Sequence, residues 1–372
     1  MRKATAIIRV MCNTGVYECS RHHMARSGSS QHLRGKHHRD YRVEQALKPC
    51  NSLNQEMIDR IDQALDAWWD DDAVHRVIVC STSEKAFCAG GDVRTSREQI
   101  LAGKSCASDQ FFADEYEMNN NIALFPKPYI SLIDGVAMGG GLGVSVHGSH
   151  RIISEKAFAA MPEMAIGFNP DVGVPFMLQR MTGLKGFASL PLAKFLVLTG
   201  WRMSPADMMW AGVATDFVPS SAFAEFREMI IAESLDEALE AFSTDAPGES
   251  ELEKIYPSIE KTFGFDTWPD IEHALGAHPD RVFAAQVTEL LKGANPESLV
   301  ASTLLMRASA LCTTLREELD HEVALGEHMR ADPNFAEGVR AVLVDKDREP
   351  HFDPKDTETV NPAPFEKNLG AS

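Results

Sequence analysis

The stretch Tyr129–Val146 (YISLIDGVAMGGGLGVSV) sets a short apolar run before a glycine-rich loop. Residues 129–133 have the apolar pattern of a buried strand, and a helix is expected after the loop 138–143. Glycines let a backbone approach a ligand closely, and the first N–H groups of a helix lack partners within it. Taken alone, the loop is more typical of a tight turn than of a ligand site.

A second glycine loop lies earlier, at Phe87–Asp92 (FCAGGD), after a strand that ends near Thr82. If both loops face one point, their N–H groups form an oxyanion hole, which binds the negative charge that develops on a carbonyl oxygen. Neither loop matches Gly-x-x-x-x-Gly-Lys-Ser/Thr or Gly-x-Gly-x-x-Gly. A phosphate-binding loop or a dinucleotide-binding fold is therefore not expected.

A third segment, Ala160–Gly173 (AMPEMAIGFNPDVG), carries two carboxylates in apolar surroundings shaped by Pro and Gly. In isolation, Glu163 and Asp171 would each be more typical of a helix cap or a solvated turn. Burial raises the pKa of a carboxyl group toward values that are useful in acid–base catalysis. Together with the two loops, these carboxylates predict a catalytic site.

Around these segments, strands and helices alternate along the chain. Ser52 and Gln55 form a capping-box pattern ahead of a helix of about four turns, which ends at Asp70–Asp72. The runs Arg76–Cys80 and Arg151–Ile153 are short and rich in β-branched residues, as buried strands are. Strands that alternate with helices predict an α/β fold.

Strand patterns end near Ser220, and the last third of the chain is predicted to be helical. Helices are expected within Ala222–Ala241, Pro279–Lys292 and Glu297–Met329. We therefore divide the chain into a basic, partly irregular segment with a first strand (1–50), an α/β catalytic core (51–220), a helical region (221–354) and a tail (355–372).

The 372 residues carry 36 Lys and Arg against 54 Asp and Glu, a net charge of −18. This negative charge argues against binding of nucleic acid or a membrane over the whole surface, because phosphate recognition needs clustered cations. No stretch approaches the roughly 20 apolar residues that cross a bilayer. The seven Cys are scattered and form no Cys-x-x-Cys pair, which is typical of reduced thiols in a cytosol-like compartment.

The first 50 residues differ from the rest, with ten Lys and Arg against three Asp and Glu. The run Ser20–Arg42 has almost no apolar periodicity and is typical of a mobile insertion or tail. Its pairs His22-His23 and His37-His38 are more typical of solvated residues than of a metal site. A basic arm could instead bind an acidic partner, which leaves a non-enzymatic scaffold as one alternative.

In this order, the three segments resemble those of the crotonase (enoyl-CoA hydratase/isomerase) superfamily. The resemblance implies an α/β fold made of a spiral of ββα units, followed by helices. It further implies that the N–H groups of Gly91 and Gly140 form the oxyanion hole, and that the Ala89 carbonyl lies near the adenine of coenzyme A. Hydratases of the superfamily carry a second glutamate early in the helix after the glycine loop, where this chain has Gly143.

The chain resembles more closely the branch of the superfamily that hydrolyses 3-hydroxyisobutyryl-CoA in valine breakdown. This branch implies thioester hydrolysis in which Glu163 attacks the carbonyl or activates a water, Asp171 assists, and Glu115 lines the acyl pocket. A hydratase or isomerase acting on a short acyl-CoA is the alternative, which the missing second glutamate disfavours. The matching stretches are Phe111–Tyr116 with Asn119 and Asn120, Gly140–Gly148, Met161–Glu163, Pro170–Gly173 and Phe335–Asp347.

Three further sites are candidates on chemistry alone. His147 follows the glycine loop closely, but it is more typical of a structural partner than of a base. His321-Glu322 begins a zinc-protease motif, yet Leu325 stands where the second histidine is required, so no metal site is expected. Cys88 has no positioned histidine in the sequence and is expected to pack rather than react.

The resemblance implies no resident cofactor, since coenzyme A enters as part of the substrate. The expected partner is a small acyl-CoA molecule, with neither nucleic acid nor a membrane, and relatives in the superfamily often form homo-oligomers. The expected compartment is the cytoplasm, or the mitochondrial matrix if the chain is eukaryotic.

Overall fold

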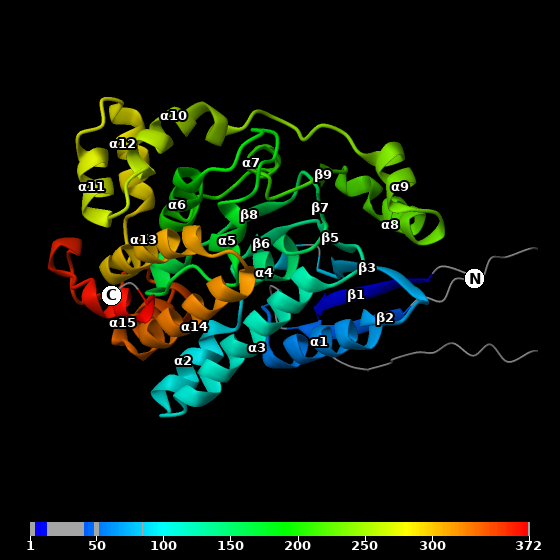
Figure 1. Cartoon of the computed structure of the whole chain (residues 1–372), viewed down its shortest axis with the longest axis horizontal. Coiled ribbons are helices and arrows are strands. Elements are labelled where there is room, and N and C mark those ends of the chain that lie inside the picture. Colours follow the sequence, from blue (N-terminus) through cyan, green and yellow to red (C-terminus); the bar gives the residue numbers. More distant parts are fainter. Residues whose placement is uncertain (1–3, 13–40, 48–51, 84, 371–372) are drawn as a thin grey trace, which may run out of the picture.

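Parallel strands in two sheets organise the chain (Figure 1). The computed structural model describes residues 4–12, 41–47, 52–83 and 85–370. A six-stranded sheet has the order β2-β1-β3-β5-β7-β9, a smaller one has the order β4-β6-β8, and all neighbouring strands are parallel. The strands are β1 (Ala4–Cys12), β2 (Tyr41–Leu47), β3 (Val74–Ser81), β4 (Ala86–Cys88), β5 (Tyr129–Ile133), β6 (Val136–Met138), β7 (His150–Ile153), β8 (Phe158–Ala160) and β9 (Asp216–Phe217).

From β3 onward, consecutive strands alternate between the two sheets. Strands β3, β5, β7 and β9 belong to the large sheet, while β4, β6 and β8 belong to the small one. Helices follow these pairs: α2 (Val93–Leu101) and α3 (Ser105–Leu124) come after β4, and α4 (Gly140–Val146) comes after β6. The chain therefore winds as a spiral of ββα units, which confirms the fold expected from the resemblance.

The predicted strands Arg76–Cys80, Tyr129–Ile133 and Arg151–Ile153 lie within β3, β5 and β7. All five residues of β5 are buried, as expected for a parallel sheet that is covered on both faces. The sequence pattern does not predict the small sheet. Its strands have three residues each, which is too few to show a period of two.

The helix predicted near residue 52 is α1 (Gln55–Trp69), but its cap is not the expected one. The side chain of Asn54 accepts the N–H of Met57 at 3.0 Å and is the N-cap. The capping box predicted to begin at Ser52 is therefore wrong. Leu53 forms a β-bridge with the first glycine loop, which keeps the chain extended at this point.

The N-terminal segment contributes β1 and β2 to one edge of the large sheet. Most of the basic run, including His22-His23 and His37-His38, lies outside the described residues. A metal site or an acidic partner at this run therefore stays a hypothesis.

Two of the predicted helical stretches are interrupted. Ser234 caps a new helix within the first stretch, and Thr314 caps another within the last through a capping box with Glu317. Helices α10 and α11 lie outside the predicted stretches. The helices are α8 (Phe223–Ala232), α9 (Leu235–Phe242), α10 (Glu251–Phe263), α11 (Trp268–Gly276), α12 (Arg281–Leu290), α13 (Pro296–Leu311), α14 (Leu315–Ala331), α15 (Pro333–Val339) and α16 (Ala363–Asn368).

One hydrophobic core joins the strands to the helices on one side of the large sheet, and it includes buried side chains from α1, α3, α13 and α14. A second cluster lies between this sheet and the pair α8 and α9, which stand apart from α10–α12 in Figure 1. There, Ile78 and Ile130 of the sheet pack with Phe226 and Ile230. Both faces of the large sheet are therefore covered.

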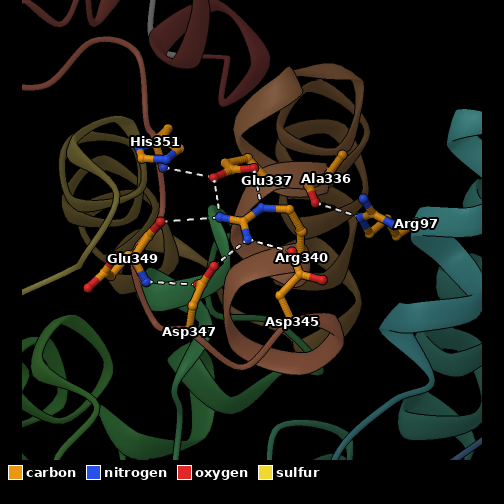
Figure 2. Close-up of polar contacts among 8 residues, drawn as sticks. All are labelled: Arg97, Ala336, Glu337, Arg340, Asp345, Asp347, Glu349 and His351. Atoms are coloured by element: carbon orange, nitrogen blue, oxygen red, sulfur yellow. Dashed lines mark hydrogen bonds and ion pairs between the residues drawn. The ribbon is translucent and has the colours of Figure 1, made fainter.

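Helix α15 packs between α2 and the 3-10 turn η1 (Glu163–Ile166). Arg97 of α2 donates from Nε to the carbonyl oxygen of Ala336 at 2.8 Å (Figure 2). On the other side, a Cβ placed on Gly338 would lie 2.4 Å from the carbonyl carbon of Ile166. Because the two backbones touch so closely, α15 holds the turn that carries Glu163.

Figure 2 shows the network that fixes the chain after α15. The Arg340 guanidinium donates from Nε and Nη2 to Glu337, each at 2.8 Å, and from Nη1 to Asp345 and Asp347, each at 2.6 Å. Its Nη2 also donates to the Glu349 carbonyl at 3.2 Å. Bidentate carboxylate contacts fix the orientation of a guanidinium. One side chain therefore ties residues 345–349 back onto α15.

The contact between α15 and η1 predicts that Gly338→Ala destabilises the fold. The added methyl group overlaps the Ile166 backbone, and overpacking of this kind costs about 1–3 kcal/mol of the free energy of unfolding. Gly276→Ala is the control, since a Cβ there has no neighbour within 4 Å and the residue ends helix α11. Urea unfolding of both variants tests this, and equal stabilities would contradict it.

Candidate active site

The two glycine loops meet at the C-terminal ends of β4 and β6. These strands are parallel neighbours, so the loops that follow them lie at the same edge of the sheet. A Cβ placed on Gly140 would lie 3.2 Å from the amide nitrogen of Gly91. Neither Gly91 nor Gly140 donates its N–H to any acceptor among the described residues. Two unbonded N–H groups therefore lie together, and their role as an oxyanion hole stays a prediction.

Gly139 lets the second loop pass close to a carboxyl group. Its φ of +46° and ψ of −120° form a backbone conformation that is strained for any residue with a Cβ. A Cβ at this position would also lie 3.0 Å from Oε1 of Glu163. The absence of a side chain therefore brings the loop and Glu163 together.

Glu163 begins η1, shortly after β8, the third strand of the small sheet. The residue is 6% exposed, and its Oε2 has no hydrogen-bond partner among the described residues. A buried carboxyl oxygen without a partner is costly and is typical of functional sites. Because η1 packs against α15, this carboxyl group is held beside the glycine loops.

Helix α3 brings two consecutive residues to the same place. Glu115 is 1% exposed, and a Cβ placed on Gly140 would lie 2.4 Å from its Oε1. The neighbouring Tyr116 donates from its hydroxyl to Oδ2 of Asp171 at 2.9 Å. Glu115 therefore borders the second glycine loop, while Tyr116 holds the Asp171 carboxyl group.

The carboxyl groups of Glu115, Glu163 and Asp171 lie close enough to influence one another's ionisation. Burial is the main cause that raises the pKa of each. It raises the pKa of Asp171 to about 7, although the Tyr116 hydrogen bond and the Arg330 charge lower it. The pKa values of the two glutamates lie well above their usual range, and the charge of Asp171 adds to both shifts. Ionisation of all three groups together is therefore unfavourable.

The structure thus brings together five of the residues predicted from sequence: Gly91, Gly140, Glu115, Glu163 and Asp171. The sixth, Ala89, lies partly buried in the same loop as Gly91. Its expected place near the adenine of coenzyme A stays a prediction.

Sequence reasoning misses two residues of the site. Tyr116 stands in a stretch that matches the hydrolase branch of the superfamily, but no local pattern links it to Asp171. Arg330 of α14 is buried, donates from Nη2 to Asp109 at 2.8 Å and lies 4.2 Å from the ring centre of Phe112. Its positive charge lowers the pKa of Asp171 and of Tyr116, so it helps the site to hold negative charge.

Cys88 is buried at the end of β4. Burial raises the pKa of its thiol to about 12, so the thiol stays protonated near neutral pH. Because the thiolate is the nucleophilic form, this residue is suited to packing, as expected from the sequence.

Because the pKa of Asp171 is raised, Asp171→Asn is expected to gain more stability over the wild type at pH 8 than at pH 4. In the native chain this carboxyl group has a pKa of about 7 when folded, against a usual value of 3.8, so folding becomes less favourable as pH rises through this interval. Each pKa unit is worth about 1.4 kcal/mol, and an amide does not titrate. Urea unfolding at both pH values measures the difference, and an advantage that is largest at pH 4 would contradict the account.

Residues 45–369 match the family model described as enoyl-CoA hydratase/isomerase. Two curated relatives named 3-hydroxyisobutyryl-CoA hydrolase, mitochondrial, are each 36% identical to the chain. The match to the Homo sapiens protein spans 339 residues, 87% of this chain and 85% of the relative. The match to the Gallus gallus protein spans 324 residues, 84% of this chain and 82% of the relative.

Two solved structures are similar over most of the chain. A structure titled as a carnitinyl-CoA dehydratase from Mycobacterium thermoresistibile is 33% identical, with a TM-score of 0.78, over 86% of this chain and 90% of that one. A structure titled as an enoyl-CoA hydratase from Rhodobacter sphaeroides 2.4.1 is 34% identical, with a TM-score of 0.77, over 86% of this chain and 91% of that one. The similarity therefore covers the helical region as well as the sheets.

Proposed function

The chain belongs to the enoyl-CoA hydratase/isomerase family, the crotonase superfamily, and on this basis we propose that it is an acyl-CoA thioester hydrolase. The substrate we propose is 3-hydroxyisobutyryl-CoA, which is cleaved to 3-hydroxyisobutyrate and coenzyme A in valine catabolism, a branch of branched-chain amino acid degradation. The names of the curated relatives support this substrate.

One observation carries the proposal: a buried carboxyl group, one oxygen of which has no hydrogen-bond partner among the described residues, lies beside two unbonded backbone N–H groups. A Cβ placed on Gly139 would lie 3.0 Å from Oε1 of Glu163, and Gly91 and Gly140 carry the N–H groups. Hydrolysis of a thioester needs a group that delivers or activates an oxygen nucleophile and donors that stabilise the oxyanion. We propose that Glu163 and these two N–H groups supply both.

In the proposed reaction, the attacking oxygen forms a bond to the thioester carbonyl carbon, and negative charge moves to the carbonyl oxygen. The N–H groups of Gly91 and Gly140 stabilise this charge, by about 3–4 kcal/mol per donor. The carbon–sulfur bond then breaks, and the thiolate of coenzyme A leaves and takes up a proton. A thiol with a pKa of roughly 8.5 leaves without a strong acid.

Glu163 has two roles open to it: it deprotonates the attacking water, or it attacks the carbonyl itself and forms an anhydride that water then hydrolyses. Both roles need the ionised carboxylate, and the raised pKa of Glu163 makes that carboxylate at once a stronger base and a stronger nucleophile, so both stay open. We propose that Asp171, held by Tyr116, orients the water or the substrate hydroxyl or assists protonation. Glu115 would line the acyl pocket, where the 3-hydroxyl group needs a hydrogen-bond partner.

Hydration of an enoyl-CoA is the second candidate, because the two similar solved structures are titled as a dehydratase and a hydratase. Adding water across a double bond is expected to use a second carboxylate at the position of Gly143. A Cβ there would lie 2.7 Å from Cβ of Val172 and 3.0 Å from Nδ2 of Asn119. A glutamate does not fit at this position without rearrangement, which supports hydrolysis.

The proposed partner is the acyl-CoA substrate itself, and we propose no resident cofactor and no metal. Among the residues that the structure describes, no helix has both the length and the apolar character needed to span a membrane. Assembly into a homo-oligomer, and a cytoplasmic or mitochondrial matrix location, stay predictions. The curated relatives are named as mitochondrial.

Glu163→Gln tests the proposal directly. The wild type is expected to release free thiol from 3-hydroxyisobutyryl-CoA, and the variant is expected to lose at least about 100-fold in kcat, since the amide neither accepts the proton nor attacks. Thiol release and crotonyl-CoA hydration are measured in parallel. Glu327→Gln, on the exposed side of α14, is the control and is expected to keep full activity.

Either of two results would contradict the proposed function. Hydration without thiol release would assign the chain to the second candidate. Absence of both activities in the wild type would favour the scaffold, in which the basic N-terminal run binds a partner.

A further inference from the structure

The chain makes a strained turn at Asp171–Val174. The N–H of Val174 donates to the Asp171 carbonyl at 3.1 Å, and the two central residues, Val172 and Gly173, have φ values of +55° and +71°. Two positive φ values are the pattern of a type I′ turn, which favours Asn, Asp or Gly at its first central position. Val172 is β-branched, so its side chain is strained in this conformation.

The same residues could form a different turn with less backbone strain. In a type II turn the first central residue has φ near −60°, which valine adopts easily, and the second has positive φ, which suits glycine. The Val172–Gly173 peptide group would face a different direction in that turn. The observed conformation therefore needs support from its surroundings.

Two buried side chains hold the two polar atoms of this single peptide group. Nε2 of His147 donates to the Val172 carbonyl at 2.7 Å. The Gly173 N–H donates to both carboxyl oxygens of Glu322, each at 3.1 Å. His147 ends helix α4, and Glu322 lies in the middle of α14, so the supports come from two separate elements.

Both side chains are suited to a structural hydrogen bond. Burial lowers the pKa of His147 to about 4, so the ring is neutral near pH 7, and its contact with a carbonyl requires the proton to be on Nε2. The pKa of Glu322 lies well above its usual range, because the group is buried and lies beside Glu318. Neither residue reaches the glycine loops through any hydrogen bond within the described part of the chain.

We propose that His147 and Glu322 are positioning residues, which hold the Val172–Gly173 peptide in its strained turn and so keep Asp171 in place for the reaction. The inference rests on the proposed hydrolase function. Asp171 is the first residue of the turn and is itself held by Tyr116. Misplacement of a reacting group by about 1 Å costs on the order of 100-fold in rate.

Variants of Glu322 test the proposal through kcat and KM for 3-hydroxyisobutyryl-CoA. Glu322→Leu removes the acceptor and is expected to lower kcat at least about 10-fold while KM changes less than about twofold. Glu322→Gln keeps an acceptor oxygen for the Gly173 N–H and is expected to stay within about threefold of the wild type. Glu327→Leu, on the exposed face of the same helix, is the matched control. An unchanged kcat in Glu322→Leu, or equal losses in both Glu322 variants, would overturn the proposal.

Val172→Gly gives a second test, because it removes the strain that the Glu322 contact is proposed to support. Glycine adopts positive φ without strain, so the turn needs less support. The kcat loss caused by Glu322→Leu is expected to shrink to less than about threefold when Val172→Gly is already present. A loss that is equally large in both backgrounds would overturn the proposal.

Hydrogen exchange without substrate separates this inference from the proposed function. Glu322→Leu is expected to speed exchange in the peptide that contains the Gly173 amide, while Glu322→Gln leaves it close to the wild type. If the wild type releases no thiol but exchange behaves as expected, the hydrolase function fails and the support of the turn stands. If thiol is released and exchange is unchanged in Glu322→Leu, the support fails and the hydrolase function stands.

Discussion

Three carboxyl groups in one buried space are the constraint on which the site depends. Charge on Glu115, Glu163 and Asp171 is costly because each is almost fully buried, and Asp171 raises the pKa of both glutamates. Tyr116 and Arg330 favour the charged form of Asp171. The protein therefore gives up stability near neutral pH to keep a carboxylate of raised pKa, which is a stronger base, beside the oxyanion donors.

The segments that carry these groups are held in place by contacts with the backbone of other elements. The short strands β4, β6 and β8 bring the two glycine loops and Glu163 to one edge of the small sheet. Helix α15 then presses against the Glu163 turn through Gly338, and Arg340 ties the following chain to α15 (Figure 2). The Phe335–Asp347 stretch, far from the site in sequence, thus acts on it by packing.

Much of this arrangement is predictable from sequence, and the limits have physical causes. Strand β5, the glycine loops and the paired carboxylates of Glu163 and Asp171 follow from local apolar and glycine patterns. The small sheet is not predicted because its strands are too short to show periodicity. The cap of α1 is predicted at the wrong residue because Leu53 forms a β-bridge with a loop that is distant in sequence. The hydrogen bonds from Tyr116 to Asp171 and from Gly173 to Glu322 join residues far apart in the chain, so no local sequence pattern predicts them.

The pH dependence of kcat/KM for thiol release, in the wild type and in Asp171→Asn, tests the central claim most directly. If ionised Glu163 drives hydrolysis, activity rises with pH as this group loses its proton. Removing the Asp171 charge lowers the pKa of Glu163, so the rise is predicted to move to lower pH, even though the maximal rate falls. A rise that stays in place, or one that moves to higher pH, would contradict the account.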